Sequence, residues 1–319
     1  RPPPWLSSRT KDRRRLSGTM SSLAAWIIVL CVSQIGMFIC TKQAAQKASL
    51  PLFICLTQFA TSAALTAFIS VLPGAGTPGR RALWRLDCSL QMLLVPLGVV
   101  WALGFVLLTA SVARMSAALA GGVVRSMEPI ASVLLGLLAG ERFSLQVVAA
   151  LVPISAGVVL ASYGGGSLNA SGVLLAMLSN FAFSARPFLA KRLKGHEVGK
   201  KLDDIEVFLA VMCVAVAFLP VAVVVVEGRA ALAAARRLWA AGDAGGFMLD
   251  TLLSGLGFFM YQFAQLRVMS QLAPLTFSVL TPISKAFMIV ACALYFGDPF
   301  GATNLAGVGV TTAGVLLFA

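Results

Sequence analysis

The run LQMLLVPLGVVWALGFVLLTAS, residues 90–111, contains no charged side chain. A helix rises about 1.5 Å per residue, so a run of this length spans the roughly 30 Å hydrocarbon core of a bilayer. Over the whole chain of 319 residues, 59% are hydrophobic and only 12% are charged. That charged share is about half of what a soluble domain carries. The composition therefore predicts a membrane protein.

Similar apolar runs recur along the chain and are separated by short charged joints. They are rich in Leu, Val and Ala, whereas the strands of a transmembrane barrel alternate with a period of two over about ten residues. The sequence predicts an all-α polytopic membrane protein. We expect ten transmembrane helices, at residues 21–41, 51–72, 90–111, 116–139, 145–163, 169–189, 205–226, 247–266, 273–296 and 302–319.

The residue types that carry most enzyme chemistry are few in this sequence. His196 is its one histidine and lies in a charged joint, and no H-E-x-x-H pattern occurs. The six cysteines have no CxxC or zinc-ligand spacing, so we interpret them as small apolar packing residues. We expect neither an enzyme, nor a metal site, nor a cofactor.

The net charge of +13 raises the possibility of a nucleic-acid partner. The cations lie mainly in the joints and not in a patch with interleaved aromatic residues, so we do not expect one. Their uneven distribution between alternate joints places both termini on the cytoplasmic or equivalent side. Residues 1–20 form a basic tail. Its composition is typical both of a transit-sequence remnant and of a polybasic juxtamembrane segment.

Two short motifs recur at a fixed distance. GERF at 140–143 matches GDPF at 297–300, and the same offset of 157 residues aligns AGVVL at 156–160 with AGVLL at 313–317. The offset predicts two halves of five helices each, residues 21–163 and 169–319. An odd number of helices inverts the second half in the membrane, which is a recurring architecture of secondary transporters. Alternatively, Gly-acidic-x-Phe is simply a good tight turn.

Charged residues interrupt the fourth and ninth predicted helices. In GGVVRSMEPI, residues 121–130, Arg125 and Glu128 are three residues apart and so share a helix face, and Pro129 frees a carbonyl one turn back, near Arg125. Under the repeat, Glu128 corresponds to Lys285. A charge at mid-bilayer costs about 2.5–3.5 kcal/mol on insertion scales, so we expect these side chains to face a cavity or a partner.

Two interpretations of these charges remain open. Arg125 and Glu128 can form a purely structural pair. Lys285 and Arg186 would then still lack a central anion, because the other acids of the predicted helices lie near helix ends. A cavity with surplus positive charge favours an anionic substrate, and the arginine fork suits phosphate. Four polar residues in apolar runs are candidates for ligand contacts or for interhelical hydrogen bonds: Thr109, Asn180, Tyr261 and Gln262.

Three longer motifs resemble a known family. They are VVRSMEPIASVLL with GERF, AMLSNFAFSARPFLAKRL, and APLTFSVLTPISKAFMIV. From residue 26 to the last residue the chain resembles the plastidic-type phosphate translocators, the triose-phosphate translocator family of the drug/metabolite transporter superfamily. The resemblance implies a ten-helix antiporter that exchanges a phosphorylated metabolite for inorganic phosphate across a plastid envelope membrane.

The resemblance also implies roles for particular residues. Arg125 matches a phosphate-binding lysine, Thr109 and Tyr261 match phosphate-contacting residues, and Lys285 matches the second member of a Lys-Arg pair. Arg186 matches an arginine that we place at the cavity, and we assign Glu128, Pro129 and Asn180 structural or gating roles. The chain departs from the family at two positions: Ser284 replaces the first member of the pair, and Val106 replaces a histidine.

We therefore expect an antiporter whose partners are a phosphorylated small molecule, inorganic phosphate and the lipid bilayer. A single lysine at the position of Lys285 is also seen in nucleotide-sugar transporters. The alternatives are thus a nucleotide-sugar or other metabolite carrier of the Golgi or endoplasmic reticulum, and a membrane scaffold whose charges are structural.

Overall fold

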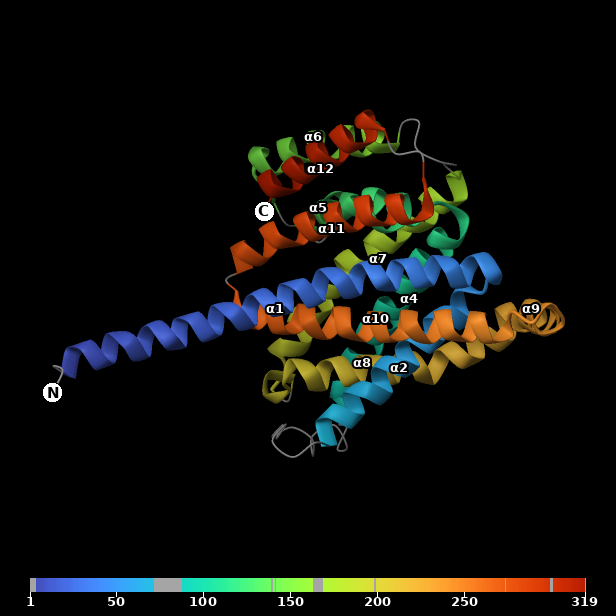
Figure 1. Cartoon of the computed structure of the whole chain (residues 1–319), viewed down its shortest axis with the longest axis horizontal. Coiled ribbons are helices and arrows are strands. Elements are labelled where there is room, and N and C mark those ends of the chain that lie inside the picture. The colour runs from blue at the N-terminus through green and yellow to red at the C-terminus, as the bar shows by residue number, and fades with distance from the viewer. Residues whose placement is uncertain are drawn as a thin grey trace.

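The computed structural model describes residues 4–71, 88–138, 140, 142–162, 169–197, 199–272, 274–298 and 301–318. These residues are almost entirely helical, and no strand occurs among them. The long helices run side by side in one bundle (Figure 1). The predicted all-α class is confirmed.

A helix lies at each of the ranges where a membrane span was expected. These helices are α1 (Pro4–Lys47), α2 (Pro51–Val71), α4 (Cys88–Arg114), α5 (Glu128–Leu138), α6 (Leu145–Ser162), α7 (Ala170–Gly195), α8 (Asp204–Ala222), α10 (Ala244–Gln271), α11 (Pro274–Phe296) and α12 (Ala302–Phe318). In the described part of the chain, six stretches are long and apolar enough to cross a membrane: Leu23–Lys47, Pro51–Val71, Leu90–Arg114, Leu119–Leu138, Ala170–Gly195 and Asp204–Ala241. This is the architecture of a polytopic membrane protein.

The fourth predicted helix differs from expectation because it is not one regular α-helix. It begins with a π-helical turn, η1 (Leu119–Val123), continues as a 3-10 turn, η2 (Val124–Met127), and becomes α-helical only at Glu128. Pro129 has no N–H to offer the carbonyl of Arg125, which accepts from the N–H of Glu128 instead. The proline thus accounts for the local change of hydrogen-bond pattern.

A second difference follows α8. The chain continues through a π-helical turn, η4 (Val223–Glu227), into a further helix, α9 (Gly228–Ala241), where a charged joint was expected. A third difference is at the start of the chain, where residues 4–20 continue helically into the first apolar helix. Some residues used for the predictions lie outside the described ranges: Arg80, Arg81, Arg85, Glu141, Pro299 and Phe300.

Acidic residues other than Glu128 are engaged near helix ends. Glu206 accepts from the backbone N–H of Asp203 at 2.9 Å and completes a capping box at the start of α8. Asp250 pairs with Lys47 at 2.8 Å. Glu227 is buried and accepts from the N–H groups of Leu52 and Phe53, at 2.8 and 3.0 Å, at the positive end of α2. These carboxylates are thus bound away from the middle of the bundle.

An aromatic cluster joins four helices at the centre of the bundle. The ring of Phe105 on α4 lies 4.7 Å from that of Phe258 on α10 and 4.9 Å from that of Phe183 on α7, measured between centroids. Phe59 on α2 lies 5.3 Å from Phe258. Both contacts of Phe105 are edge-on, the arrangement that aromatic quadrupoles favour. The cluster fixes the part of α7 from which the site is built.

Helices α6 and α12 pack side by side through small residues (Figure 1). A Cβ atom added to Gly307 would collide with the backbone of Ala161, whereas one added to Gly309 would meet nothing within 4 Å. We expect Gly307→Leu to push the helices apart and to cost about 3 kcal/mol of stability, and Gly309→Leu to be tolerated. Thermal unfolding in detergent measures both, and equal melting temperatures for the two variants would contradict this packing.

Candidate functional site

Side chains of α7 bind the backbone of the irregular turn at residues 119–127 and of Glu128, which follows it. Asn180 is fully buried and donates to the carbonyl of Val124 at 2.9 Å. Ser184 donates to the carbonyl of Glu128 at 3.2 Å, and Ser132 donates to Ser184 at 2.9 Å. Irregular backbone at membrane depth occurs where protein buries it or where it lines a cavity. Turns of this kind are frequent at functional sites.

A cluster of opposite charges lies beside this turn. Glu128 Oε2 is 3.4 Å from Lys285 Nζ, which donates a hydrogen bond to it, and 4.0 Å from Arg125 Nη2. Glu128 and Lys285 are the two residues that the 157-residue offset aligned, and they come from η2/α5 and α11. The two halves of the sequence therefore meet at this contact.

Two arginines of the site lie against aromatic rings. The guanidinium of Arg125 lies 3.8 Å from the centroid of Phe183, and that of Arg186 lies 5.8 Å from the same ring. Arg186 also lies 4.1 Å from the ring of Trp101 on α4. Aromatic faces attract cations without neutralising them. The rings therefore hold both arginines in place while leaving their charge available.

The site carries more positive than negative charge. Arg125, Arg186 and Lys285 face one carboxylate, Glu128, and among the described residues no ion pair joins Arg186 to a carboxylate. The side chains of Arg125 and Lys285 are 12% and 13% exposed, and that of Glu128 is 29% exposed. The cluster is thus shielded from bulk water but not sealed. Such an arrangement attracts a small anion, and the low local dielectric strengthens the attraction.

The two predicted neutral contacts of the substrate, Tyr261 and Thr109, lie in different surroundings. Tyr261 lies within electrostatic range of Arg125 and Arg186. Thr109 is buried, and its hydroxyl accepts from the thiol of Cys55 at 3.1 Å. Ser284, where the resemblance leads one to expect a cation, is buried next to Lys285 in sequence. Val106 packs against the hydrophobic core.

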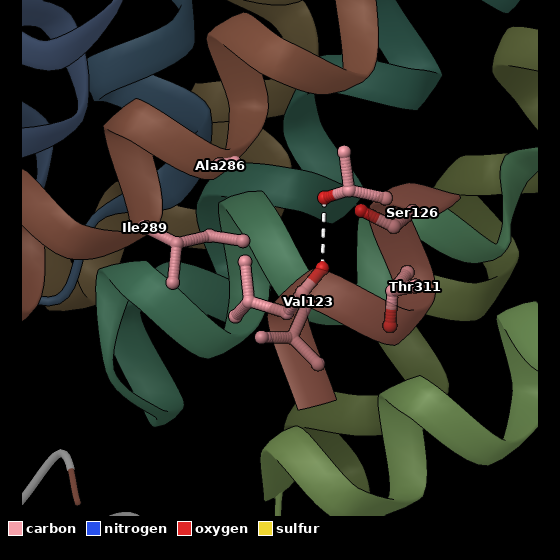
Figure 2. Close-up of a pocket in the computed structure, with 7 residues that line it drawn as sticks. Val123, Ser126, Ala286, Ile289 and Thr311 are labelled. Carbon is pink, nitrogen blue, oxygen red and sulfur yellow. Dashed lines mark hydrogen bonds between the residues drawn. The ribbon is translucent and has the colours of Figure 1, made fainter. Parts of the chain in front are cut away.

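A small cavity is lined by residues of the irregular turn, of α11 and of α12. Figure 2 shows the side chains of Ser126 and Thr311 on one side of it and those of Val123 and Ile289 on the other. The cavity has a volume of about 10 Å³, roughly the space that one water molecule needs. It is too small for a phosphorylated metabolite. The accessible face of the charged cluster is therefore the candidate site.

Sequence reasoning missed the aromatic and hydroxyl residues of the site. Phe183 precedes Arg186 by three residues, and this spacing places both on one helix face. The position of Phe183 beside an arginine could therefore have been predicted. Trp101 and Ser132 had no such signal, because their partners come from other helices. Gly121 and Gly122 permit close packing at the irregular turn, because an added Cβ atom would collide with Phe38 and with Ile289 respectively.

A membrane bundle with an irregular helix beside a cluster of surplus cations has the features of a transporter for an anion. The sequence profile described as the Triose-phosphate Transporter family matches residues 21–319. The chain therefore belongs to the Triose-phosphate Transporter family.

Curated relatives carry more specific names. The chain is 31% identical to the phosphoenolpyruvate/phosphate translocator 2, chloroplastic, of Arabidopsis thaliana, over 70% of this chain and 59% of the relative. It is 28% identical to the triose phosphate/phosphate translocator, non-green plastid, chloroplastic, of Brassica oleracea var. botrytis, over 70% and 56%. It is 27% identical to the xylulose 5-phosphate/phosphate translocator, chloroplastic, of Arabidopsis thaliana, over 61% and 47%. The matches thus span about half of the length of these relatives.

Proposed function

We propose that this protein is an antiporter that exchanges a phosphorylated small metabolite for inorganic phosphate by alternating access. The observation that carries the proposal is the cluster of Arg125, Lys285 and Arg186 around a single carboxylate. Arg125 and Lys285 grip the phosphate, and Arg186 adds a third positive charge. Tyr261 and Thr109 are the proposed neutral hydrogen-bonding partners. Glu128, Pro129 and Asn180 shape the irregular turn that holds Arg125.

The proposed binding step replaces one anion by another. In the empty site, Lys285 and Arg125 lie near Glu128. A phosphate dianion brings more charge and more acceptor oxygens than one carboxylate, and guanidinium forks match its geometry. When phosphate binds, it therefore replaces Glu128 as the ionic partner of Lys285 and Arg125.

Exchange follows from the cost of burying charge. An empty site with surplus cations resists closing into a dry, occluded state, because desolvating unpaired charges costs several kcal/mol. A bound phosphate offsets this cost. The carrier then crosses between its two open states when loaded, and counter-exchange is favoured over net flux.

We further propose ten membrane spans in two inverted halves, with residues 1–20 as a basic tail. The packing supports this arrangement. Adding 157 to the bounds of α4 gives 245–271, almost the bounds of α10, and adding it to the bounds of α1 gives 161–204, a range that contains α7. As the symmetry requires, α1 packs on α10 and α4 packs on α7.

Finer details agree with the same symmetry. Gly140 and Gly297 are separated by 157 residues, and both adopt positive φ, at 82° and 65°. Their left-handed conformation ends the preceding helices. At the α6/α12 interface, a Cβ on Gly157 would meet Thr311, and one on Gly314 would meet Ile154. These two contacts exchange under the offset.

The proposed location is a plastid envelope membrane. The relatives with the names given above are chloroplastic, and each is named as a translocator of phosphate and a phosphorylated metabolite. The solutes in their names, phosphoenolpyruvate, xylulose 5-phosphate and triose phosphate, differ in the part that is not phosphate. The shared chemistry is the phosphate, which is the part that the described cations suit.

The test is uptake of labelled inorganic phosphate by liposomes that contain the purified protein. Vesicles preloaded with phosphate, phosphoenolpyruvate or triose phosphate should take up label, and empty vesicles should not. Inhibition by nucleoside monophosphate but not by phosphate or triose phosphate would instead indicate a nucleotide-sugar carrier. Failure of every preloaded substrate, with protein that remains folded, would refute the antiporter.

A further inference from the structure

Helix α9 begins where the lipid-facing surface of α8 ends. Val224, Val225 and Val226 in η4 are strongly exposed, as expected of residues that face acyl chains. Glu227 follows directly and is fixed to the first turn of α2. Figure 1 shows α9 at the end of the bundle opposite the N-terminus, turned out of the plane in which α8 and α10 run. The helix therefore lies at the level where a bilayer gives way to water.

One face of α9 is attached to the bundle. Leu238 is buried in a small core that includes Leu50 and Phe247, and Ala231 and Ala234 pack against the same core. Beside this face, Arg237 donates to the carbonyl of Lys47 at 2.6 Å. These contacts hold α9 across the ends of α1, α2 and α10.

The other face of α9 carries a stripe of residues that are exposed and not packed against the bundle. Arg229, Leu232, Arg236 and Trp239 follow one another at intervals of three and four residues, so they lie along one side of the helix. We call these four residues the outer stripe. Leu232 is 64% exposed and Trp239 is 81% exposed, and both arginines are exposed.

The outer stripe combines two chemistries that neither water nor hydrocarbon alone satisfies. Arginine forks bind phosphate groups, while leucine and tryptophan favour an apolar or interfacial environment. The helix Gly228–Ala241 contains three arginines and no acidic residue, so its charge complements an anionic surface. A basic amphipathic helix with exposed tryptophan is typical of helices that lie in a membrane interface.

We propose that the outer stripe of α9 binds the headgroups of anionic phospholipids in the leaflet at this end of the protein. Arg229 and Arg236 are two helical turns apart and contact lipid phosphates. Leu232 and Trp239 insert at the level of the glycerol backbone. The contact is independent of the substrate site, and it ties the ends of α1, α2 and α10 to the membrane surface.

The test measures the environment of Trp239 in lipid nanodiscs that contain phosphatidylcholine with increasing fractions of phosphatidylglycerol. Some of the lipids carry bromine near the top of the acyl chain, because bromine quenches nearby tryptophan. The protein has five tryptophans, so the signal of Trp239 is taken as the difference between the full chain and its Trp239→Phe variant. We expect this signal to be quenched, and the quenching to rise with the fraction of phosphatidylglycerol.

Charge-removing variants identify the residues that bind. Arg229→Gln and Arg236→Gln should each raise the half-saturating fraction of phosphatidylglycerol about fivefold, given a contribution of about 1 kcal/mol per arginine near an anionic surface. The double variant should lose the dependence on phosphatidylglycerol. The matched control, Lys191→Gln with Arg192→Gln, removes two exposed cations at the end of α7 and should leave the signal unchanged.

Either of two results would overturn the proposal. Trp239 that is not quenched in any nanodisc would lie in water. Quenching that is the same with and without phosphatidylglycerol, or the same in the double variant, would mean that anionic headgroups are not bound by these arginines.

Discussion

Replacing Lys285 by alanine should lower phosphate counter-exchange about 100-fold or more. Lys285 Nζ is one of two cationic groups within 4 Å of Glu128 Oε2, where the incoming phosphate is proposed to take over. Removing one partner of a hydrogen-bonded charge pair of this kind costs about 2–5 kcal/mol, or roughly 30-fold to several thousand-fold, and 100-fold lies in the lower part of this range. Uptake of labelled phosphate into phosphate-loaded liposomes measures the effect, and Arg125→Ala should behave in the same way.

Two controls separate a specific effect from a general loss of charge or fold. Lys191→Ala removes an exposed cation at the end of α7 and should leave the exchange rate within about twofold of the unmodified protein. Lys285→Arg keeps the charge and should retain more activity than Lys285→Ala. If both Lys285→Ala and Arg125→Ala exchanged phosphate at near-normal rates, these residues would not form the phosphate site.

The second large effect is expected for Glu128→Gln. This change should lower the melting temperature of the empty protein and increase the stabilisation that phosphate adds. Without the carboxylate, the net charge of the cluster rises from +2 to +3, because three cations then lack their one anion. The pair is partly buried, so breaking it should cost less than the about 3–5 kcal/mol of a fully buried pair, and the empty protein should still melt at a lower temperature. Phosphate no longer competes with Glu128 and should restore more stability than it adds to the unmodified protein.

Thermal unfolding with and without millimolar phosphate measures both parts of this prediction. The matched control is Glu227→Gln, which removes a buried carboxylate outside the cluster. It should lower the melting temperature without changing the increase that phosphate produces. An increase in Glu128→Gln no larger than in the unmodified protein would show that Glu128 does not compete with phosphate.

The positions of the helices could be predicted because a bilayer imposes a simple rule on sequence. Each span needs about 20 apolar residues, and the joints gather the charges. The equivalent positions of Glu128 and Lys285 could also be predicted from the offset of 157 residues, but their direct contact was not, because Glu128 was paired with Arg125 and Lys285 was expected to lack a central anion. Their contact at 3.4 Å agrees with that alignment.

Other features depend on contacts between helices, which the sequence of one helix does not contain. Trp101 holds Arg186 only because α4 lies beside α7. The π-helical and 3-10 turns before Glu128 are supported by Asn180 and Ser184 of α7, although Pro129 gave a local signal for them. Helix α9 was missed because its three arginines gave it the composition of a charged joint.

Our central claim is that Arg125 and Lys285 jointly bind the phosphate of the transported solute. The most direct measurement is an experimental structure of the full chain determined with saturating inorganic phosphate. We expect one phosphate within hydrogen-bonding distance of Arg125 and of Lys285 Nζ, with Glu128 moved away from Lys285. A phosphate bound elsewhere, with Lys285 still on Glu128, would contradict it.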